Sequence, residues 1–155
     1  MFAPKKMAAS VALIAATTLP AVADIDASSE QLIADFLQKE GYQAKLEVLD
    51  DGEPVIRSSE AGSDFSIYFY DCTNGTNCKT IQFFTAYDLD NGMTMDQVNT
   101  WNREFRFGKV YLDDENDPFL EMDVNLDYGV SEGNFLDTLD WWTVVLGRFE
   151  EYIDW

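Results

Sequence analysis

Histidine is absent from this sequence of 155 residues. It is the commonest general base among side chains and a frequent metal ligand, so its absence excludes Ser–His and Cys–His nucleophile chemistry. Catalysis by a pair of carboxylates remains possible, since glycoside hydrolysis uses two carboxylates at a spacing of about 5 to 10 Å. However, 29 acidic residues supply such pairs by abundance alone. We therefore predict that the protein is not an enzyme and that it carries no cofactor.

Basic residues are also scarce. The chain has 10 Lys and Arg residues against 29 Asp and Glu residues, which gives a net charge of −19 at pH 7. Such a field repels phosphate backbones and anionic lipid surfaces, so nucleic acid is excluded as a partner. The acids are spread along the chain, which favours a solvated surface kept soluble by its charge. Attraction to a basic partner or to divalent cations is the alternative.

The apolar run at residues 11–19 is too short and too rich in alanine to span a hydrocarbon core of about 30 Å. It follows a start that has two lysines and no acid, and it precedes a small-residue site, Ala-Val-Ala. This order is typical of a secretory signal peptide over residues 1–23, cleaved between Ala23 and Asp24. We expect residues 24–155 to be a single domain, periplasmic or secreted, with a net charge of −21 and no membrane-spanning segment.

Cysteine is limited to Cys72 and Cys78. The residues between them, Thr-Asn-Gly-Thr-Asn, are turn formers, and an Asn-Gly pair readily adopts the positive φ values of a tight reversal. A redox pair would need the Cys-x-x-Cys spacing, and a zinc site would need further Cys or His ligands. We therefore predict a structural disulfide across the mouth of a β-hairpin.

Hydrophobic periodicity predicts an α+β fold. The first helix begins with a capping box at Ser28 and stops at Gly41. The later elements are strands over residues 45–49, 54–58, 64–71 and 80–87, a helix over 94–107, strands over 109–113 and 118–127, and a long helix that begins at Ser131. Thr94 and Gln97 form a second capping box at the start of the middle helix. The order α-β-β-β-β-α-β-β-α predicts an antiparallel sheet with helices packed on it.

Both faces of the predicted sheet carry aromatic residues. In the strand at residues 64–71, Phe65 and Phe69 point to one face, whereas Tyr68 and Tyr70 point to the other. An outer face rich in aromatic residues is unusual for a solvated sheet. We therefore expect part of the outer face to be covered.

The last helix carries an apolar seam along its whole length. The members of this seam are Phe135, Leu139, Trp142, Leu146, Phe149 and Ile153. Trp141, Val145 and Tyr152 form an adjoining apolar strip, and one of the two surfaces must cover the sheet. If the other stays exposed, it favours a homodimer or a bound partner segment.

The segment WNREFRFGKVYLD at residues 101–113, continued by DPFLEMD at residues 117–123, resembles the central motif of the YbjN-domain family. The resemblance extends upstream through DFSIYFY at residues 64–70 and IQF at residues 81–83. It covers the chain from Gly41 to the C-terminus.

The resemblance implies a fold like that of type III secretion chaperones, in a family described as a bacterial sensory transduction regulator. Two features depart from the family pattern. Asn116 stands where the family usually has Gly in a turn, which Asn tolerates because it also visits positive φ. The second departure from the family pattern is the signal peptide, since many family members look cytoplasmic.

The polar face of the helix at residues 94–107 is the candidate interaction face, with Trp101, Asn102, Arg103 and Arg106. One interpretation is that the arginines pair with nearby acids and that the aromatic residues fill the core. The other interpretation is a recognition face, because Arg and Trp often dominate protein interfaces.

The acidic turn from Asp113 to Asp117 supplies clustered oxygen ligands of the kind that calcium prefers. The EF-hand pattern fails here, because Pro118 stands where that loop requires Gly and the flanks are predicted strands. We therefore favour an exposed hairpin turn, with a cation site as the alternative, and we predict no metal ligands.

Two functions from different classes follow. The first is a non-catalytic protein-binding module of the bacterial envelope, with a chaperone-like or regulatory role and a protein partner, a client or a second copy of itself. The second is a small-ligand or cation-binding protein with a closed pocket lined by aromatic residues. We prefer the first, because the resemblance is to proteins that bind polypeptides.

Overall fold

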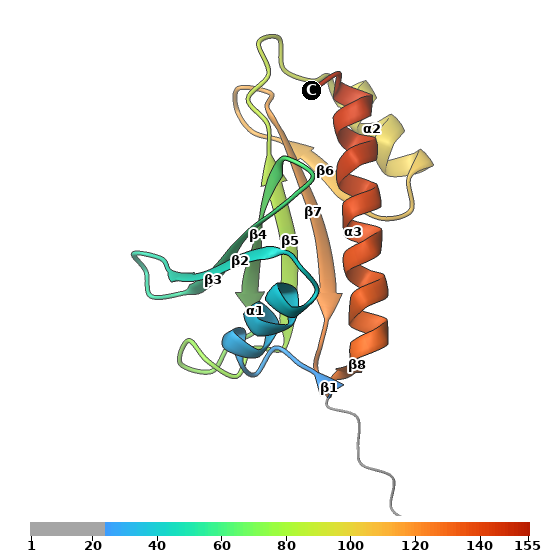
Figure 1. Ribbon diagram of the computed structural model, residues 1–155. Helices are drawn as coiled ribbons and strands as arrows, with labels where there is room; N and C mark the ends of the chain where they lie inside the picture. Colours follow the sequence, from blue (N-terminus) through green and yellow to red (C-terminus); the bar gives the residue numbers. More distant parts are fainter. Residues whose placement is uncertain (1–23) are drawn as a thin grey trace, which may run out of the picture.

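The computed structural model describes residues 24–155, which form a six-stranded antiparallel sheet, a two-stranded pair and three helices (Figure 1). The expected signal peptide over residues 1–23 lies outside the described residues. In chain order the elements are β1 (Asp24–Ile25), α1 (Glu30–Lys39), β2 (Gln43–Val48), β3 (Pro54–Glu60), β4 (Ser63–Tyr70), β5 (Thr80–Ala86), α2 (Met95–Glu104), β6 (Lys109–Leu112), β7 (Pro118–Asn125), β8 (Val130–Ser131) and α3 (Glu132–Ile153). Apart from the short strands β1 and β8, this is the predicted α+β order.

The large sheet has the order β2-β3-β4-β5-β7-β6, and every neighbouring pair is antiparallel. The strands β2 to β5 follow one another along the chain. After β5, the helix α2 carries the chain to β6 at the far edge, and β7 then inserts between β6 and β5 with Met122 opposite Phe83. The pair β1–β8 lies outside this sheet, beside the start of α3. Within residues 24–155, no helix is long and apolar enough to cross a membrane.

The hydrophobic core lies between one face of the sheet and the helices α1 and α3 (Figure 1). Trp142 of α3 stacks on Phe83 with ring centroids 5.4 Å apart and meets Phe65 edge-on at 5.8 Å. Phe36 of α1 packs edge-on against Phe135 of α3 at 5.4 Å. The predicted seam of α3 is confirmed, because all its members are buried except Ile153, which is partly buried.

The predicted starts of α2 and α3 are confirmed. The Thr94 hydroxyl accepts a hydrogen bond from the Gln97 amide at 3.3 Å, and the Gln97 side chain accepts one from the Thr94 amide at 2.8 Å. This is the reciprocal capping box that the sequence predicts. Ser131 caps α3 in the predicted place.

The predicted cap of α1 is wrong by one residue. Ser29 is the N-cap, and its hydroxyl accepts a hydrogen bond from the Leu32 amide at 3.3 Å. Ser28 is held elsewhere, because its own amide donates to the Asp26 carboxylate at 2.9 Å. Two adjacent serines offer the same local signal, and the hydrogen bond to Asp26 selects the second as the cap.

The sequence predicts that part of the outer face of the sheet is covered, and Gln82 and Glu121 on this face are buried. Within the part of the chain that the structure describes, the aromatic residues on this face cover one another. Tyr68 meets Phe84 edge-on at 5.4 Å, Phe84 lies 5.6 Å from Phe119, and Phe119 stacks on Tyr111 at 5.2 Å. Cross-strand pairs of this kind bury aromatic area without a second layer.

The predicted disulfide joins Cys72 to Cys78 in the loop between β4 and β5. Asn74 and Gly75 at the tip have φ values of 55° and 74°, as the Asn-Gly pair predicts. The Thr73 amide donates to the Thr76 carbonyl at 2.7 Å and closes the turn. The bond therefore fixes the end of a hairpin, with Cys78 buried in the main core and Cys72 packed against it.

We expect the double variant Cys72→Ser/Cys78→Ser to fold, with a free energy of unfolding lowered by about 2 kcal/mol, because the disulfide restricts only a short loop in the unfolded chain. Urea unfolding followed by circular dichroism measures this loss, with the reduced and the oxidised wild-type protein as controls. Loss of the cooperative transition in the double variant would show that the disulfide holds more of the fold than this loop.

Candidate functional site

A groove lies between the C-terminal end of α2 and the middle of α3. Its volume is ≈ 270 Å³ and its lining is mostly apolar. We call it the helix groove, and its lining residues are Trp101, Glu104, Phe105, Arg106, Phe107, Trp141, Val144, Val145 and Arg148. Three large apolar side chains are substantially exposed here, namely Phe107 at 36%, Trp141 at 42% and Val144 at 41%. The rings of Phe107 and Trp141 lie 5.0 Å apart, so the exposed side chains form a continuous patch.

The early end of α2 builds one wall of this groove. The sequence predicts a helix that ends near Gly108, but α2 ends at Glu104, and Phe105 already has an extended backbone with φ −104° and ψ 132°. The Phe105 ring then stacks on Trp101 with centroids 3.9 Å apart. At Gly108, where φ is 81°, the chain runs so close to α3 that an added Cβ would lie 2.5 Å from Val145 Cγ1. Packing against α3 therefore replaces the last helical turn.

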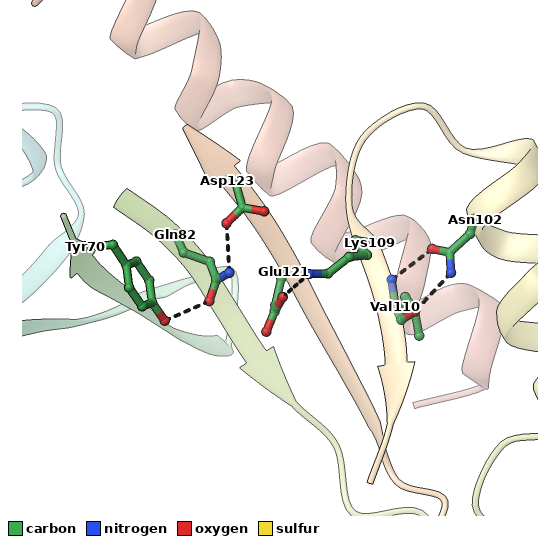
Figure 2. Close-up of polar contacts among 7 residues, drawn as sticks. All are labelled: Tyr70, Gln82, Asn102, Lys109, Val110, Glu121 and Asp123. Carbon is green, nitrogen blue, oxygen red and sulfur yellow. Dashed lines mark hydrogen bonds and ion pairs between the residues drawn. The ribbon is translucent and has the colours of Figure 1, made fainter. Parts of the chain in front are cut away.

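The predicted site residues Trp101 and Asn102 have structural roles. Trp101 is fully buried, and its Nε1 donates a hydrogen bond to the Gly108 carbonyl at 2.8 Å. The Asn102 side chain donates to the Val110 carbonyl and accepts from the Val110 amide, both at 2.9 Å (Figure 2). Val110 belongs to the edge strand β6, whose outward backbone groups would otherwise be open to pairing with another chain.

The predicted site residues Arg103 and Arg106 are both exposed but have different neighbours. Arg103 pairs with Glu104 at 3.3 Å on the surface of α2. Arg106 lies over the Phe107 ring, 5.6 Å from its centre, and borders the helix groove. The structure therefore does not bring the four predicted residues onto one surface. A binding role for Arg103 stays a prediction.

The sequence reasoning missed Phe107, Val144 and Arg148. Trp141, Val144 and Arg148 are spaced by three and four residues on α3, so they lie along one stripe of the helix, opposite the buried seam. The predicted apolar strip instead joined Trp141 to Val145 and Tyr152, and Val145 is buried. Their spacing in the sequence already places these three residues on one face of the helix. A solvent face with Trp, Val and Arg does not by itself indicate a binding site.

The uncovered face of the sheet carries a second set of polar residues (Figure 2). The Tyr70 hydroxyl donates to Gln82 Oε1 at 3.2 Å, and the Gln82 amide donates to Asp123 at 2.8 Å. Lys109 Nζ lies 2.6 Å from the carboxylate of Glu121, which is only 7% exposed. These hydrogen bonds and this ion pair join neighbouring strands and hold them in register.

Two titratable groups of this face, Lys109 and Tyr111, have pKa values raised above their ordinary values. A hydrogen bond and the charge of Glu121 raise the pKa of Lys109 above its ordinary value. Burial, and then the same carboxylate, raises the pKa of Tyr111 above its ordinary value. A raised pKa leaves even less of the deprotonated tyrosine or lysine available at neutral pH to act as a base. The electrostatics of this face therefore do not favour proton transfer.

A broad hollow of ≈ 640 Å³ lies over the strands β2 to β5. It is open to solvent and is lined largely by polar and small residues, with Phe65 and Phe84 as its aromatic members. Small-molecule sites are usually enclosed and mostly apolar. Neither this hollow nor the helix groove is the closed aromatic pocket that the small-ligand alternative predicts.

The acidic turn between β6 and β7 uses its carboxylates to hold its own backbone. Asp113 Oδ1 accepts hydrogen bonds from the amides of Glu115 and Asp117, both at 2.9 Å, and Asp117 Oδ1 accepts one from the Leu89 amide at 2.9 Å. Asn116 has φ 68°, as its place in the turn predicts. Carboxylate oxygens of Asp113, Glu115 and Asp117 lie within 4.8 Å of one another. The hydrogen bonds that hold the turn bring these carboxylates together.

Comparison with known proteins identifies one family. The model of the YbjN family, described as "Putative bacterial sensory transduction regulator", matches residues 29–155. No curated protein and no solved structure matches the chain. The matched range includes both walls of the helix groove and the whole six-stranded sheet.

We expect Asn102→Ala to lower the free energy of unfolding by about 1 to 2 kcal/mol, because it leaves the amide and the carbonyl of Val110 without their partner. It should also increase self-association, because the edge of β6 becomes available for pairing. Urea unfolding and light scattering measure the two effects.

Asn102→Asp is the matched control for this prediction, since its carboxylate still accepts from the Val110 amide but cannot donate to the carbonyl. Its stability should fall between those of the wild type and Asn102→Ala. Equal stability of all three proteins would show that these two hydrogen bonds do not stabilise the edge.

Proposed function

This chain belongs to the YbjN family, and from that membership we propose that it is a non-catalytic, exported protein-binding module of the bacterial envelope, with a regulatory or chaperone-like role. The helix groove is its binding surface, and a short segment of a partner protein occupies it. The family description as a regulator agrees with a role exerted through binding.

The observation that carries this proposal is the exposed apolar patch of the helix groove. Phe107, Trp141 and Val144 lie together at the surface of a protein in which most large apolar side chains are buried. Contiguous exposed apolar side chains bordered by polar ones are typical of protein interaction sites. Trp and Arg, both present here, are the residue types that most often contribute large binding energies.

The composition of the helix groove also opposes catalysis. Its lining contains a single carboxylate, Glu104, which pairs with Arg103. Hydrolysis by carboxylates needs two of them across the reacting bond, and the chain has no histidine to act as base. A groove with apolar walls and arginine at its border is better suited to holding a polypeptide.

The proposed export is supported by the order of charged, apolar and small residues in the first part of the sequence. It is also supported by the Cys72–Cys78 bond, because disulfides persist in oxidising compartments and are rare in the cytosol. We expect cell fractionation to find the protein outside the cytoplasm. Its intact mass should match that of a chain that begins at Asp24. A cytoplasmic protein that retains residues 1–23 would overturn this part of the proposal.

The binding surface can be tested by photo-crosslinking in living cells of the native host. A photoreactive phenylalanine analogue replaces Trp141 in the helix groove, and in a matched variant it replaces Tyr128, an exposed aromatic residue shortly before α3. We expect a discrete protein adduct from position 141 and none from position 128. Adducts of equal yield from both positions, or none from position 141, would remove the helix groove as the binding surface.

A further inference from the structure

We infer that the occupant of the helix groove is an acidic segment of another protein, one that places a carboxylate beside a large apolar side chain. This inference rests on the proposed function and adds to it the chemistry of the partner. It follows from the way in which the basic residues of this chain are paired.

Most of the basic side chains in residues 24–155 have an acidic partner. Six of the eight lie within 4.0 Å of a carboxylate, namely Lys39, Lys45, Arg57, Lys79, Arg103 and Lys109. Within the same range of the chain, Arg106 and Arg148 have no carboxylate at this distance. Both of them line the helix groove.

This distribution is unexpected in a chain with 29 acidic residues. Surface arginines in such a chain find carboxylates easily, as the other basic residues do. Arg106 comes from the segment after α2 and Arg148 comes from α3, so two distant parts of the sequence bring unpaired guanidinium groups to one groove. A guanidinium binds a carboxylate through two parallel hydrogen bonds, which makes it selective for that group. The missing acidic partner is therefore best supplied by the occupant.

The apolar part of the occupant follows from the apolar side chains that line the groove together with the two arginines. Phe107, Trp141 and Val144 present exposed aromatic and branched surfaces there. The groove volume of ≈ 270 Å³ is below the roughly 300 to 1,000 Å³ of typical small-molecule sites. This volume suits two side chains of a short peptide segment. An apolar side chain would lie on the apolar patch, and an acidic side chain would lie beside one of the arginines.

The net charge of this protein limits how acidic the segment can be. Residues 24–155 carry a net charge of −21, which repels a long acidic run. At physiological salt this repulsion is screened beyond about 8 Å, whereas a carboxylate in contact with a guanidinium is screened much less. The segment should therefore carry only a few acids, placed next to its apolar residue.

The test is a selection from a random peptide library displayed on phage, against the protein purified as it accumulates in cells with its disulfide intact. The library is first depleted on the Trp141→Ala variant. This step removes basic peptides that bind the acidic surface outside the helix groove. We expect the enriched peptides to carry Asp or Glu close to Phe, Leu or Trp. Enriched peptides without acids would overturn this inference.

A synthetic, fluorescently labelled peptide with the enriched sequence then measures affinity by anisotropy. We expect Arg106→Gln/Arg148→Gln to weaken its binding at least about tenfold, because each lost bond to a charged group is worth about that much. Arg57→Gln is the matched control, since Arg57 is on β3, is paired with Glu47 and does not line the helix groove. We expect it to leave the affinity nearly unchanged. An equal loss in both variants would overturn the inference.

The peptide side of the contact gives the second control. Replacing the acid of the peptide by its amide should weaken binding to the wild type and have little further effect on Arg106→Gln/Arg148→Gln, because the two changes remove the same contact. Independent, additive losses would show that the acid binds elsewhere and would overturn the inference.

The outcomes separate this inference from the proposed function. Acid-free peptides that depend on Trp141 would leave the helix groove as a protein-binding surface and overturn only the chemistry of the partner. A library that yields no peptide dependent on Trp141 would overturn both. A dimer in light scattering that Trp141→Ala dissociates would assign the helix groove to a second copy of this chain and also overturn the acidic partner.

Discussion

The burial of one stripe of α3 against the sheet is the contact on which the other features of the described structure depend. Trp142 lies near its middle, stacked on Phe83 of β5. Because this stripe faces inward, the stripe with Trp141, Val144 and Arg148 must face outward. The helix groove is therefore a consequence of where α3 packs, since the segment after α2 runs along the same side of this helix.

The segment that resembles the family motif is largely a packing motif in this chain. Trp101 is buried and holds the carbonyl of Gly108, and Asn102 covers the edge of β6 through Val110. These contacts hold α2 against β6, and the Trp101 ring also packs edge-on against Phe149 of α3. In this segment, the residues that line the helix groove, Arg106 and Phe107, are neighbours in sequence of residues that stabilise the fold. The sequence of the motif therefore does not distinguish the exposed residues from structural ones such as Trp101 and Asn102.

The two uncovered surfaces of the molecule differ in how far their polar groups are satisfied. On the outer face of the sheet, Gln82 and Glu121 are buried and hydrogen-bonded to their neighbours (Figure 2). At the helix groove, the guanidinium groups of Arg106 and Arg148 have no carboxylate within 4.0 Å in residues 24–155. A satisfied network stabilises a surface as it is, whereas unpaired cations beside exposed apolar side chains gain free energy from a suitable partner. This difference supports the proposal that a partner binds at the helix groove.

The sequence by itself determined the α+β class, the order of the main elements, the Cys72–Cys78 disulfide, the capping box at Thr94 and the positive φ of Asn116. These features depend on residues close together in the chain, so periodicity and turn chemistry reveal them. Only the tertiary structure decided that β7 lies between β5 and β6, that α2 ends early, and that Arg106 and Arg148 border one groove. Such features depend on residues far apart in the sequence that pack or pair through space. Local patterns show which face of an element is apolar but not which other element will cover it.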